Sequence, residues 1–391
     1  MQLRKHKVTE APETDNLRKV RVIEDESGMA DIPFLALTLL LVAIGLITLF
    51  SASYARAYNE EGNNPAKYFI RQAILAVLGI VIMLVISRLN YQIFYRLSKP
   101  LLVVAIVLLL AVLAVGVEAN GAKRWVRLPV LGQFQPSEVA KVAVVMSFAA
   151  LMTEYRDKMS DWRYGLLPYV AILGIIAVLL YLEPHMSATL IILAVGFVMM
   201  IVGGTKPKHL ALLALAGILL VAIYLMTKGY TGDRLSAWID PESDPSDKGY
   251  QTLQSQYAIG SGGFLGLGFG KSRQKYLYLP EEHNDYIFAI FCEEMGFVGA
   301  VCIIILFALL IIRGYWIAMH ARDRFGLLIA AGFTTLLALQ VALNMAVVSN
   351  LLPSTGISLP FFSYGGTALM IQLAEMGMIL SVSRWNKNKI T

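Results

Sequence analysis

The chain has 391 residues and a formal net charge of +6, with 57% of its residues hydrophobic and only 15% charged. Soluble domains usually carry about 25% charged residues and at most about 50% apolar ones. The composition therefore excludes an ordinary soluble domain and predicts an all-α, polytopic integral membrane protein. Because cationic loops explain the positive charge of such a protein, no nucleic-acid partner is expected.

The first stretch of the chain, residues 1–31, is polar, carries several acids and shows no helical periodicity. Such a composition cannot bury enough apolar surface to fold, so we expect a disordered N-terminal tail. The apolar run that follows is long enough to span a bilayer and lacks an Ala-x-Ala cleavage site. These features favour a first transmembrane helix over a removable signal peptide.

Apolar runs predict ten transmembrane helices in a membrane domain that covers residues 32–385, followed by a short tail at 386–391. In chain order the predicted spans are 32–52, 68–87, 100–117, 137–153, 166–182, 186–204, 209–227, 285–312, 326–350 and 365–383. Lysine and arginine are concentrated in the loops on the N-terminal side of the membrane. The positive-inside rule therefore places both termini in the cytoplasm.

One long loop, residues 228–284, is expected to face the outside of the cell. Loops of this length are usually functional or disordered. The stretch at 260–270 interleaves glycine with Phe and Leu, which predicts a close-packed segment at the membrane surface. The tripeptide Gly-Lys-Ser at 270–272 is not a nucleotide-binding P-loop, because Leu265 stands where that motif needs a glycine.

Two cysteines, Cys292 and Cys302, fall in one predicted span. Their spacing puts them on different faces of a helix, so a disulfide between them is not expected. We expect both to be small, buried hydrophobic side chains.

The first segment that could carry chemistry lies just before the fourth predicted span. It holds Lys123, Arg124 and Arg127 around Trp125. Three cations and an indole at the membrane surface could bind an anionic headgroup. An aromatic-belt tryptophan with snorkelling cations would give the same pattern, so both interpretations stay open.

Two charged residues, Glu138 and Lys141, lie at the start of the fourth predicted span. An unpaired ammonium inside a membrane span costs several kcal/mol, on the order of 3 by insertion scales. Because the two residues are three positions apart on a helix, we expect them to form an ion pair.

The second segment places Glu281, Glu282, His283 and Asp285 directly before an apolar run. If this segment were helical, Glu281 and Asp285 would share one face. Carboxylates there could act as a general base or bind a divalent cation. Acidic residues also favour the N-terminus of a helix for structural reasons, and that alternative stays open.

A third segment, Glu183-Pro184-His185, forms a tight outer turn between two spans. Two potential ligands are too few for a metal site, so a loop histidine with an ordinary hydrogen bond is the simpler interpretation. The fourth segment, residues 350–366, combines prolines, paired aromatics and Gly-Gly around Ser363. This pattern is typical of a rigid turn that allows close helix packing.

Polar residues also lie within the predicted spans, namely Arg71, Gln340, Asn344, Gln372 and Glu375. A transport pathway, a groove for lipid headgroups and hydrogen bonds between helices would each use such residues. All three interpretations fit the sequence.

Four short sequences stand in the same order along the chain as the signature segments of one family. They are Gly-Ala-Lys-Arg-Trp at 121–125, Phe-Gln-Pro-Ser-Glu at 134–138, Leu-Pro-Glu-Glu-His-Asn-Asp-Tyr at 279–286 and Leu-Pro-Phe-Phe-Ser-Tyr-Gly-Gly at 359–366. With these segments, residues 32–385 resemble the SEDS (shape, elongation, division and sporulation) family of peptidoglycan glycosyltransferases.

The resemblance implies a GT-C-like SEDS fold of ten helices with both termini cytoplasmic, in the bacterial cytoplasmic membrane. It also implies polymerisation of lipid II at the outer face of that membrane. Asp285 matches the essential acidic residue of the family, and Trp125 matches its tryptophan in the first cationic segment. The sequence at 278–284 looks more like the division and sporulation branch (FtsW and SpoVE) than the elongation branch (RodA), which implies a role at the division septum.

From this resemblance we hypothesise that Asp285 is the catalytic base, and that cations hold the leaving diphosphate. The candidate substrate-binding residues are Lys123, Arg124, Trp125, Arg127, Glu138, Lys141, Lys275, Glu281, Glu282, His283 and Ser363. No cofactor is required by the sequence, although a magnesium or manganese ion could bind Glu281 or Glu282.

The partners that the resemblance implies are lipid II, a class B penicillin-binding protein, other division proteins and membrane lipid. A lipid II flippase is the main competing interpretation, and it would concentrate polar residues near the bilayer midplane. An elongation-type polymerase and a scaffold without catalysis are also compatible with the sequence.

Overall fold

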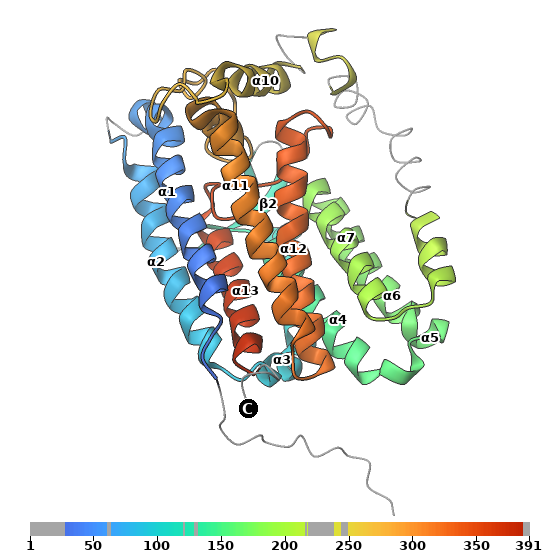
Figure 1. The fold of residues 1–391 in the computed structure, drawn as a ribbon. Helices are drawn as coiled ribbons and strands as arrows, with labels where there is room; N and C mark the ends of the chain where they lie inside the picture. The colour runs from blue at the N-terminus through green and yellow to red at the C-terminus, as the bar shows by residue number, and fades with distance from the viewer. Residues whose placement is uncertain are drawn as a thin grey trace, which may run out of the picture.

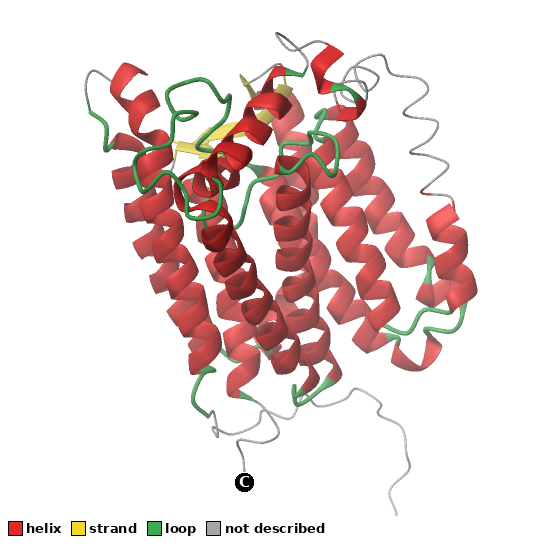
Figure 2. Ribbon diagram, turned by 45° about the horizontal axis from the view of Figure 1, so that its top comes forward, coloured by secondary structure: helices red, strands yellow, loops and turns green. Residues whose placement is uncertain are grey.

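The computed structural model describes residues 28–60, 64–119, 122–128, 132–215, 217, 238–243 and 249–385. Long helices run side by side through the molecule, and the short helix α10 lies across one end of them (Figure 1). The strands gather at the same end (Figure 2), which we call the sheet end.

The long helices have bounds that follow the apolar runs of the sequence closely. They are α1 (Ile32–Glu60), α2 (Lys67–Arg88), α3 (Gln92–Val115), α4 (Pro136–Glu154), α6 (Leu167–Leu182), α7 (Met186–Val202), α11 (Ile287–Met319), α12 (Arg324–Val348) and α13 (Gly366–Arg384). Shorter helical pieces are η1 (Arg156–Lys158), α5 (Trp162–Gly165), η2 (Pro241–Ser243) and α10 (Tyr250–Gly262).

Within the described ranges, eight helical stretches are long and apolar enough to cross a membrane, and α7 is a shorter apolar helix. The prediction of a polytopic membrane protein is therefore confirmed. The predicted span at 209–227 lies largely outside the described residues, so the count of ten stays a prediction. Helix α1 continues to Glu60, well beyond its predicted end at residue 52. Hydropathy marks only the part of a helix that lies in lipid, and polar residues extend α1 beyond that part.

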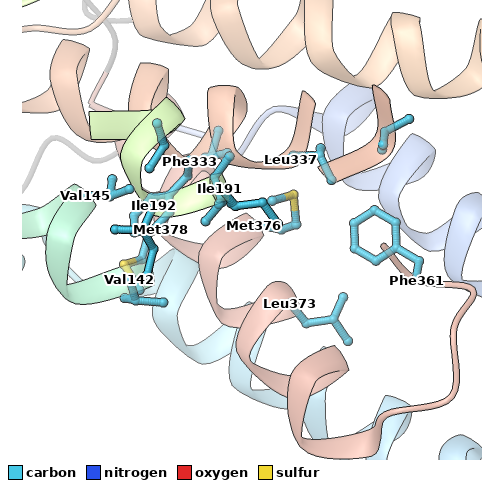
Figure 3. Close-up of a cluster of buried hydrophobic side chains, with 14 of the residues drawn as sticks. Val142, Val145, Ile191, Ile192, Phe333, Leu337, Phe361, Leu373, Met376 and Met378 are labelled. Carbon is cyan, nitrogen blue, oxygen red and sulfur yellow. The ribbon is translucent and has the colours of Figure 1, made fainter. Parts of the chain in front are cut away.

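The helices divide into an inner and an outer set. Most of the apolar part of α4, α12 and α13 is buried (83%, 72% and 72%), whereas only 22–39% is buried in α1, α2, α3 and α11. Figure 3 shows the inner packing, where side chains of α4, α7, α12 and α13 meet, for example Val142, Ile192, Phe333 and Met376. The outer helices therefore supply the surface for lipid, and the inner ones can position polar groups away from it.

Helices α2 and α13 pack closely along their length. Glycines at the contact permit this approach, because a Cβ on Gly377 would lie 2.7 Å from the carbonyl oxygen of Met83. A Cβ on Gly366 would lie 1.9 Å from Leu75 Cδ1. This packing brings the start of α13 against the first turns of α2.

Three short strands interrupt the expected all-helical pattern. They are β1 (Val117–Ala119), β2 (Ala122–Leu128) and β3 (Gly132–Phe134), which form an antiparallel sheet in the order β1-β2-β3. The sequence pattern indicates only a loop in this segment, because β1 and β3 have three residues each and the polar and apolar residues of β2 do not alternate regularly. The sheet fixes the first cationic segment as β2, with Val117 opposite Trp125 and Phe134 opposite Val126.

The two ends of the described chain meet at the end of the bundle opposite the sheet end. The backbone N–H of Gly28 donates to the carbonyl oxygen of Arg384 at 3.0 Å, and Arg313 Nη2 lies 2.8 Å from Asp31 Oδ2. This arrangement agrees with termini on one side of the membrane. That this side is the cytoplasm stays a prediction.

The two cysteines are both free, as predicted. Cys292 is buried, but the prediction that Cys302 is buried was wrong. Cys302 lies on the outer surface of α11, beside the exposed Ile304 and Ile305.

Candidate functional site

A cavity of about 740 Å³ opens among the inner helices, the start of α2, the sheet and the turns of the sheet end. Most of the predicted site residues line it, namely Arg124, Trp125, Arg127, Glu138, Lys141, Glu281, His283, Asp285 and Ser363. Segments far apart in the sequence therefore line one polar cavity. The sequence alone predicts only that these segments lie on the same side of the membrane.

The segment that carries Asp285 is a series of turns, and helix α11 begins only at Ile287. The arrangement of Glu281 and Asp285 on one helix face is therefore not what the structure shows. Glu281 has a positive φ of 56°, and the backbone N–H of Asn284 donates to its carbonyl oxygen at 3.1 Å. The side-chain amide of Asn284 also donates to Glu281 Oε2 at 2.6 Å, which commits that carboxylate to the turn.

Two neighbouring segments hold this turn in place. The amide of Asn344 on α12 donates to the carbonyl oxygen of Asp285 at 2.8 Å. The hydroxyl of Ser363 donates to the carbonyl oxygen of Asn284 at 2.8 Å, and accepts the backbone N–H of Leu359 at 2.7 Å. Ser363 therefore links two turns, in addition to lining the cavity.

The pair that opens α4 is formed as predicted. Lys141 Nζ lies 2.8 Å from Glu138 Oε2, and both side chains are nearly buried. Because the two charges offset each other, the remaining cations on the described lining are the arginines Arg71, Arg124 and Arg127. Their guanidinium groups can bind a phosphate through two parallel hydrogen bonds.

The turn between α6 and α7 contributes His185, which the sequence indicates only as an ordinary loop histidine. Its Nε2 lies 3.2 Å from Gln135 Nε2, and it lines the cavity. Burial lowers the pKa of His185 to about 3, with Arg124 and Lys141 adding to the effect, so the ring is neutral at pH 7. Burial also raises the pKa of the neighbouring Glu183 to about 8, which Arg124 opposes.

Three predicted site residues lie outside the cavity. Lys123 is exposed on β2 and does not line it. Glu282 is fully buried, and Arg56 binds both of its carboxylate oxygens at 2.8 and 2.9 Å. Burial opposes ionisation of Glu282, but the imidazole of His283, whose Nδ1 lies 3.7 Å from Oε1, and the hydrogen bonds from Arg56 outweigh it and lower the pKa of that carboxyl.

Lys275, the third of these residues, lies in a closed cluster between α1 and α11. Its Nζ is 3.1 Å from Glu294 Oε1 and donates to Ser51 Oγ at 3.0 Å. The carboxylate of Glu293 accepts the backbone N–H groups of Arg273 and Gln274 at 3.0 and 3.3 Å. This cluster fixes the loop before residue 279 against the bundle.

The predicted ligands for a divalent cation do not converge. Glu281 accepts a hydrogen bond from Asn284, and Glu282 is bound by Arg56. Across the described part of the chain, no group of three or more His, Cys, Asp or Glu side chains is arranged to hold a metal ion.

Several lining residues were absent from the predicted site. The sequence marks Arg71, Gln340 and Gln372 only as polar residues within spans, and it predicts no functional role for Tyr68 and His185. Each of the first three is a polar residue set in an apolar run, with Gln72 directly after Arg71, and that position is the signal that the sequence offers. Tyr68 and Tyr364 pack edge to face with ring centroids 4.9 Å apart at the cavity wall.

Comparison with known proteins gives a consistent result. The model of a family described as cell cycle proteins, FtsW, RodA and SpoVE, matches residues 32–388. A probable peptidoglycan glycosyltransferase FtsW of Geobacter sp. (strain M18) is 39% identical over 355 residues, which is 90% of this chain and 96% of that protein. The stage V sporulation protein E of Bacillus subtilis (strain 168) is 35% identical over 359 residues, covering 91% of this chain and 98% of that protein.

Solved structures share the fold. One is a chain in a study of the structural coordination of polymerization and crosslinking by a peptidoglycan synthase complex, with a TM-score of 0.75 and 31% identity over 91% of this chain and 98% of that chain. Another is the rod shape determining protein RodA of Thermus thermophilus, with a TM-score of 0.67 and 28% identity over 93% and 98% of the two chains.

Proposed function

The chain belongs to the FtsW, RodA and SpoVE family of cell cycle proteins, and from this premise we propose that it is a peptidoglycan glycosyltransferase that polymerises lipid II. The observation that carries the proposal is that Asp285 lines the same cavity as Arg71, Arg124 and Arg127. One glycosyl transfer from a lipid diphosphate needs both kinds of group, a base for the acceptor and cations for the leaving group.

Asp285 acts as the general base in this proposal. It accepts the proton of the acceptor sugar hydroxyl while the hydroxyl oxygen forms a bond to the anomeric carbon of the donor. The bond between that carbon and the diphosphate oxygen breaks, and the diphosphate leaves with the electron pair. Attack from the face opposite the leaving group inverts the configuration at the anomeric carbon, as it does when inverting glycosidases use a carboxylate base.

The arginines that line the cavity stabilise the diphosphate as its negative charge grows. Arg71 extends from α2, while Arg124 and Arg127 extend from β2, so the cations come from two separate elements. A cavity of about 740 Å³ is within the range of roughly 300–1,000 Å³ that is usual for ligand sites. The rings of Trp125, Tyr68 and Tyr364 supply flat apolar surfaces for the sugars.

The partner in this proposal is a class B penicillin-binding protein that cross-links the glycan product. A structural relative from a complex that coordinates polymerization and crosslinking supports such a partner. Relatives that carry the FtsW name support a role at the division septum. The excess of cations in the loops on the side of the termini supports cytoplasmic termini, which orient the cavity toward the outside of the cell.

The test is polymerisation of purified lipid II by the purified protein with its penicillin-binding partner. Wild type is expected to form glycan chains, and folded Asp285→Ala is expected to form none. Asp157→Ala is the matched control, because Asp157 is exposed on η1 at the opposite end of the bundle. Wild type that moves lipid II across vesicle membranes but forms no glycan would overturn the polymerase in favour of a flippase.

A further inference from the structure

The side-chain amide of Asn344 joins the turn that carries Asp285 to a second turn. Its Nδ2 donates to the carbonyl oxygen of Asp285 at 2.8 Å and to that of Ile357 at 2.6 Å. Asn344 is only 1% exposed, and it does not line the cavity. Asn344 can therefore influence the cavity only through the residues to which it donates hydrogen bonds.

The two contacts require a side chain with two hydrogen-bond donors at this position, and the amide nitrogen of Asn344 supplies them. The carbonyls of Asp285 and Ile357 belong to turns, so no helix or sheet pairs them, and buried carbonyls without a partner are costly. A neutral NH2 group has two donors, one for each carbonyl. Since both neighbours are acceptors, the nitrogen and not the oxygen of the amide must face them.

The second turn also touches the side chain of Asp285. Gly356 has a positive φ of 67°, and a Cβ built there would lie 3.1 Å from Asp285 Oδ2. The carboxylate therefore rests against a bare stretch of backbone next to the carbonyl that Asn344 holds. Ser187 at the start of α7 donates to the carbonyl oxygen of Thr355, which fixes the turn from its other side.

We propose that Asn344 is a positioning residue for Asp285, because its one amide fixes both the backbone of the base and the turn whose glycine leaves room for the carboxylate. This inference rests on the proposed function of Asp285. A reacting group displaced by about 1 Å can lose about 10²-fold in rate. Because Asn344 does not face the cavity, its loss changes the chemical step and leaves substrate binding unchanged.

The experiment measures kcat and KM for lipid II polymerisation by Asn344→Ala in complex with the penicillin-binding partner. We expect kcat to fall by about 10- to 100-fold with KM unchanged within about twofold. Ser255→Ala is the matched control, because Ser255 is fully buried and donates to the carbonyl oxygen of Val348 on the same helix as Asn344 at 2.7 Å, away from Asp285. This control is expected to lower the melting temperature without a loss of kcat.

Two further variants separate donor chemistry from volume and from folding. Asn344→Asp keeps the shape but presents oxygens to two carbonyls, so kcat should fall at least as far as in Asn344→Ala. Gly356→Ala places a methyl group against the carboxylate on an exposed turn and should also lower kcat. Its control is Gly204→Ala, which has a comparable positive φ of 82° but no atom within 4 Å of the added Cβ.

The outcomes separate this inference from the proposed function. Full activity in Asp285→Ala would overturn the base itself. Loss of activity in Asp285→Ala together with wild-type kcat in Asn344→Ala and Asn344→Asp would overturn only the positioning role. A fall in kcat of the same size in Ser255→Ala would also overturn it, because general destabilisation would then explain the effect.

Discussion

The sheet end of the molecule contains two regions rich in charged side chains, and they have opposite characters: one is buried within the protein, whereas the other borders the cavity. In the closed cluster, Lys275 Nζ has acceptors from Ser51, Gly270 and Glu294 at 3.0, 2.6 and 3.1 Å. In the cavity, Asp285 and the arginines border about 740 Å³ of open space. The first region is filled by its own side chains, whereas the second has room for a ligand.

The difference shows that the residue types alone do not identify a reactive site. Lys275 and Asp285 belong to the same outer segment and are only ten positions apart in the sequence. Lys275 is enclosed by protein acceptors and holds a loop, whereas Asp285 lines a space that a substrate can enter. Variants of the closed cluster should therefore change stability, and variants of the cavity should change activity.

The largest effect is expected when the closed cluster is broken. Glu294→Ala leaves the ammonium of Lys275 buried without its counter-charge, which typically costs about 3–5 kcal/mol. The midpoint of thermal unfolding in detergent should fall markedly. The double variant Lys275→Met, Glu294→Met removes both charges at similar volume and should retain more stability than Glu294→Ala. A wild-type midpoint in Glu294→Ala would contradict the distinction between the two regions.

A cavity arginine should show the opposite behaviour. Arg71→Ala removes one cation from the proposed diphosphate site, and we expect a loss of about 10²–10³-fold in kcat with a small change in the melting midpoint. Arg71→Lys keeps the charge but loses the planar fork, so it should recover only part of the rate. The control is Arg88→Ala, an exposed arginine at the other end of α2. Equal rates in Arg71→Ala and Arg88→Ala would remove Arg71 from the site.

The smallest effect concerns Glu183 and depends on pH. Its pKa is raised by burial from 4.5 to about 8, so the folded protein keeps a proton that the unfolded chain loses between these values. The stability that goes with the protonated carboxyl of Glu183 is therefore fully present below about pH 4.5 and is lost as pH rises toward 8. Glu183→Gln cannot ionise, so it should melt like wild type at pH 5 and on the order of a few °C higher by pH 8. A difference that stays constant from pH 5 to pH 9 would contradict this account.

Much of the fold follows from the sequence, because apolar runs report directly which residues can face lipid. The ends of helices were less predictable. Helix α1 continues to Glu60 and places Arg56 next to Glu282, although hydropathy ends the span near residue 52. The strand β2 is not predicted by the sequence, because the polar and apolar residues of Ala-Lys-Arg-Trp-Val-Arg-Leu do not alternate regularly.

The sequence identified residues that line the cavity where several chemical groups occur together, as at Trp125 and Asp285. The site was not predictable where tertiary packing decides the outcome. No pattern near Lys275 reveals that Ser51 and Glu294 will enclose it. An arginine within an apolar run, as at Arg71, fits several roles, and the packing of α2 against α13 places the start of α2 beside the cavity.

The most direct test of the central claim compares Asp285→Asn with wild type in the presence of the penicillin-binding partner. Asparagine keeps the size of the side chain but cannot accept the proton, and a general base typically contributes about 10²–10⁴-fold to the rate. We predict that Asp285→Asn binds lipid II with an affinity within a fewfold of wild type and forms glycan at least about 10²-fold more slowly. Glycan formation at the wild-type rate would contradict the assignment of Asp285 as the base.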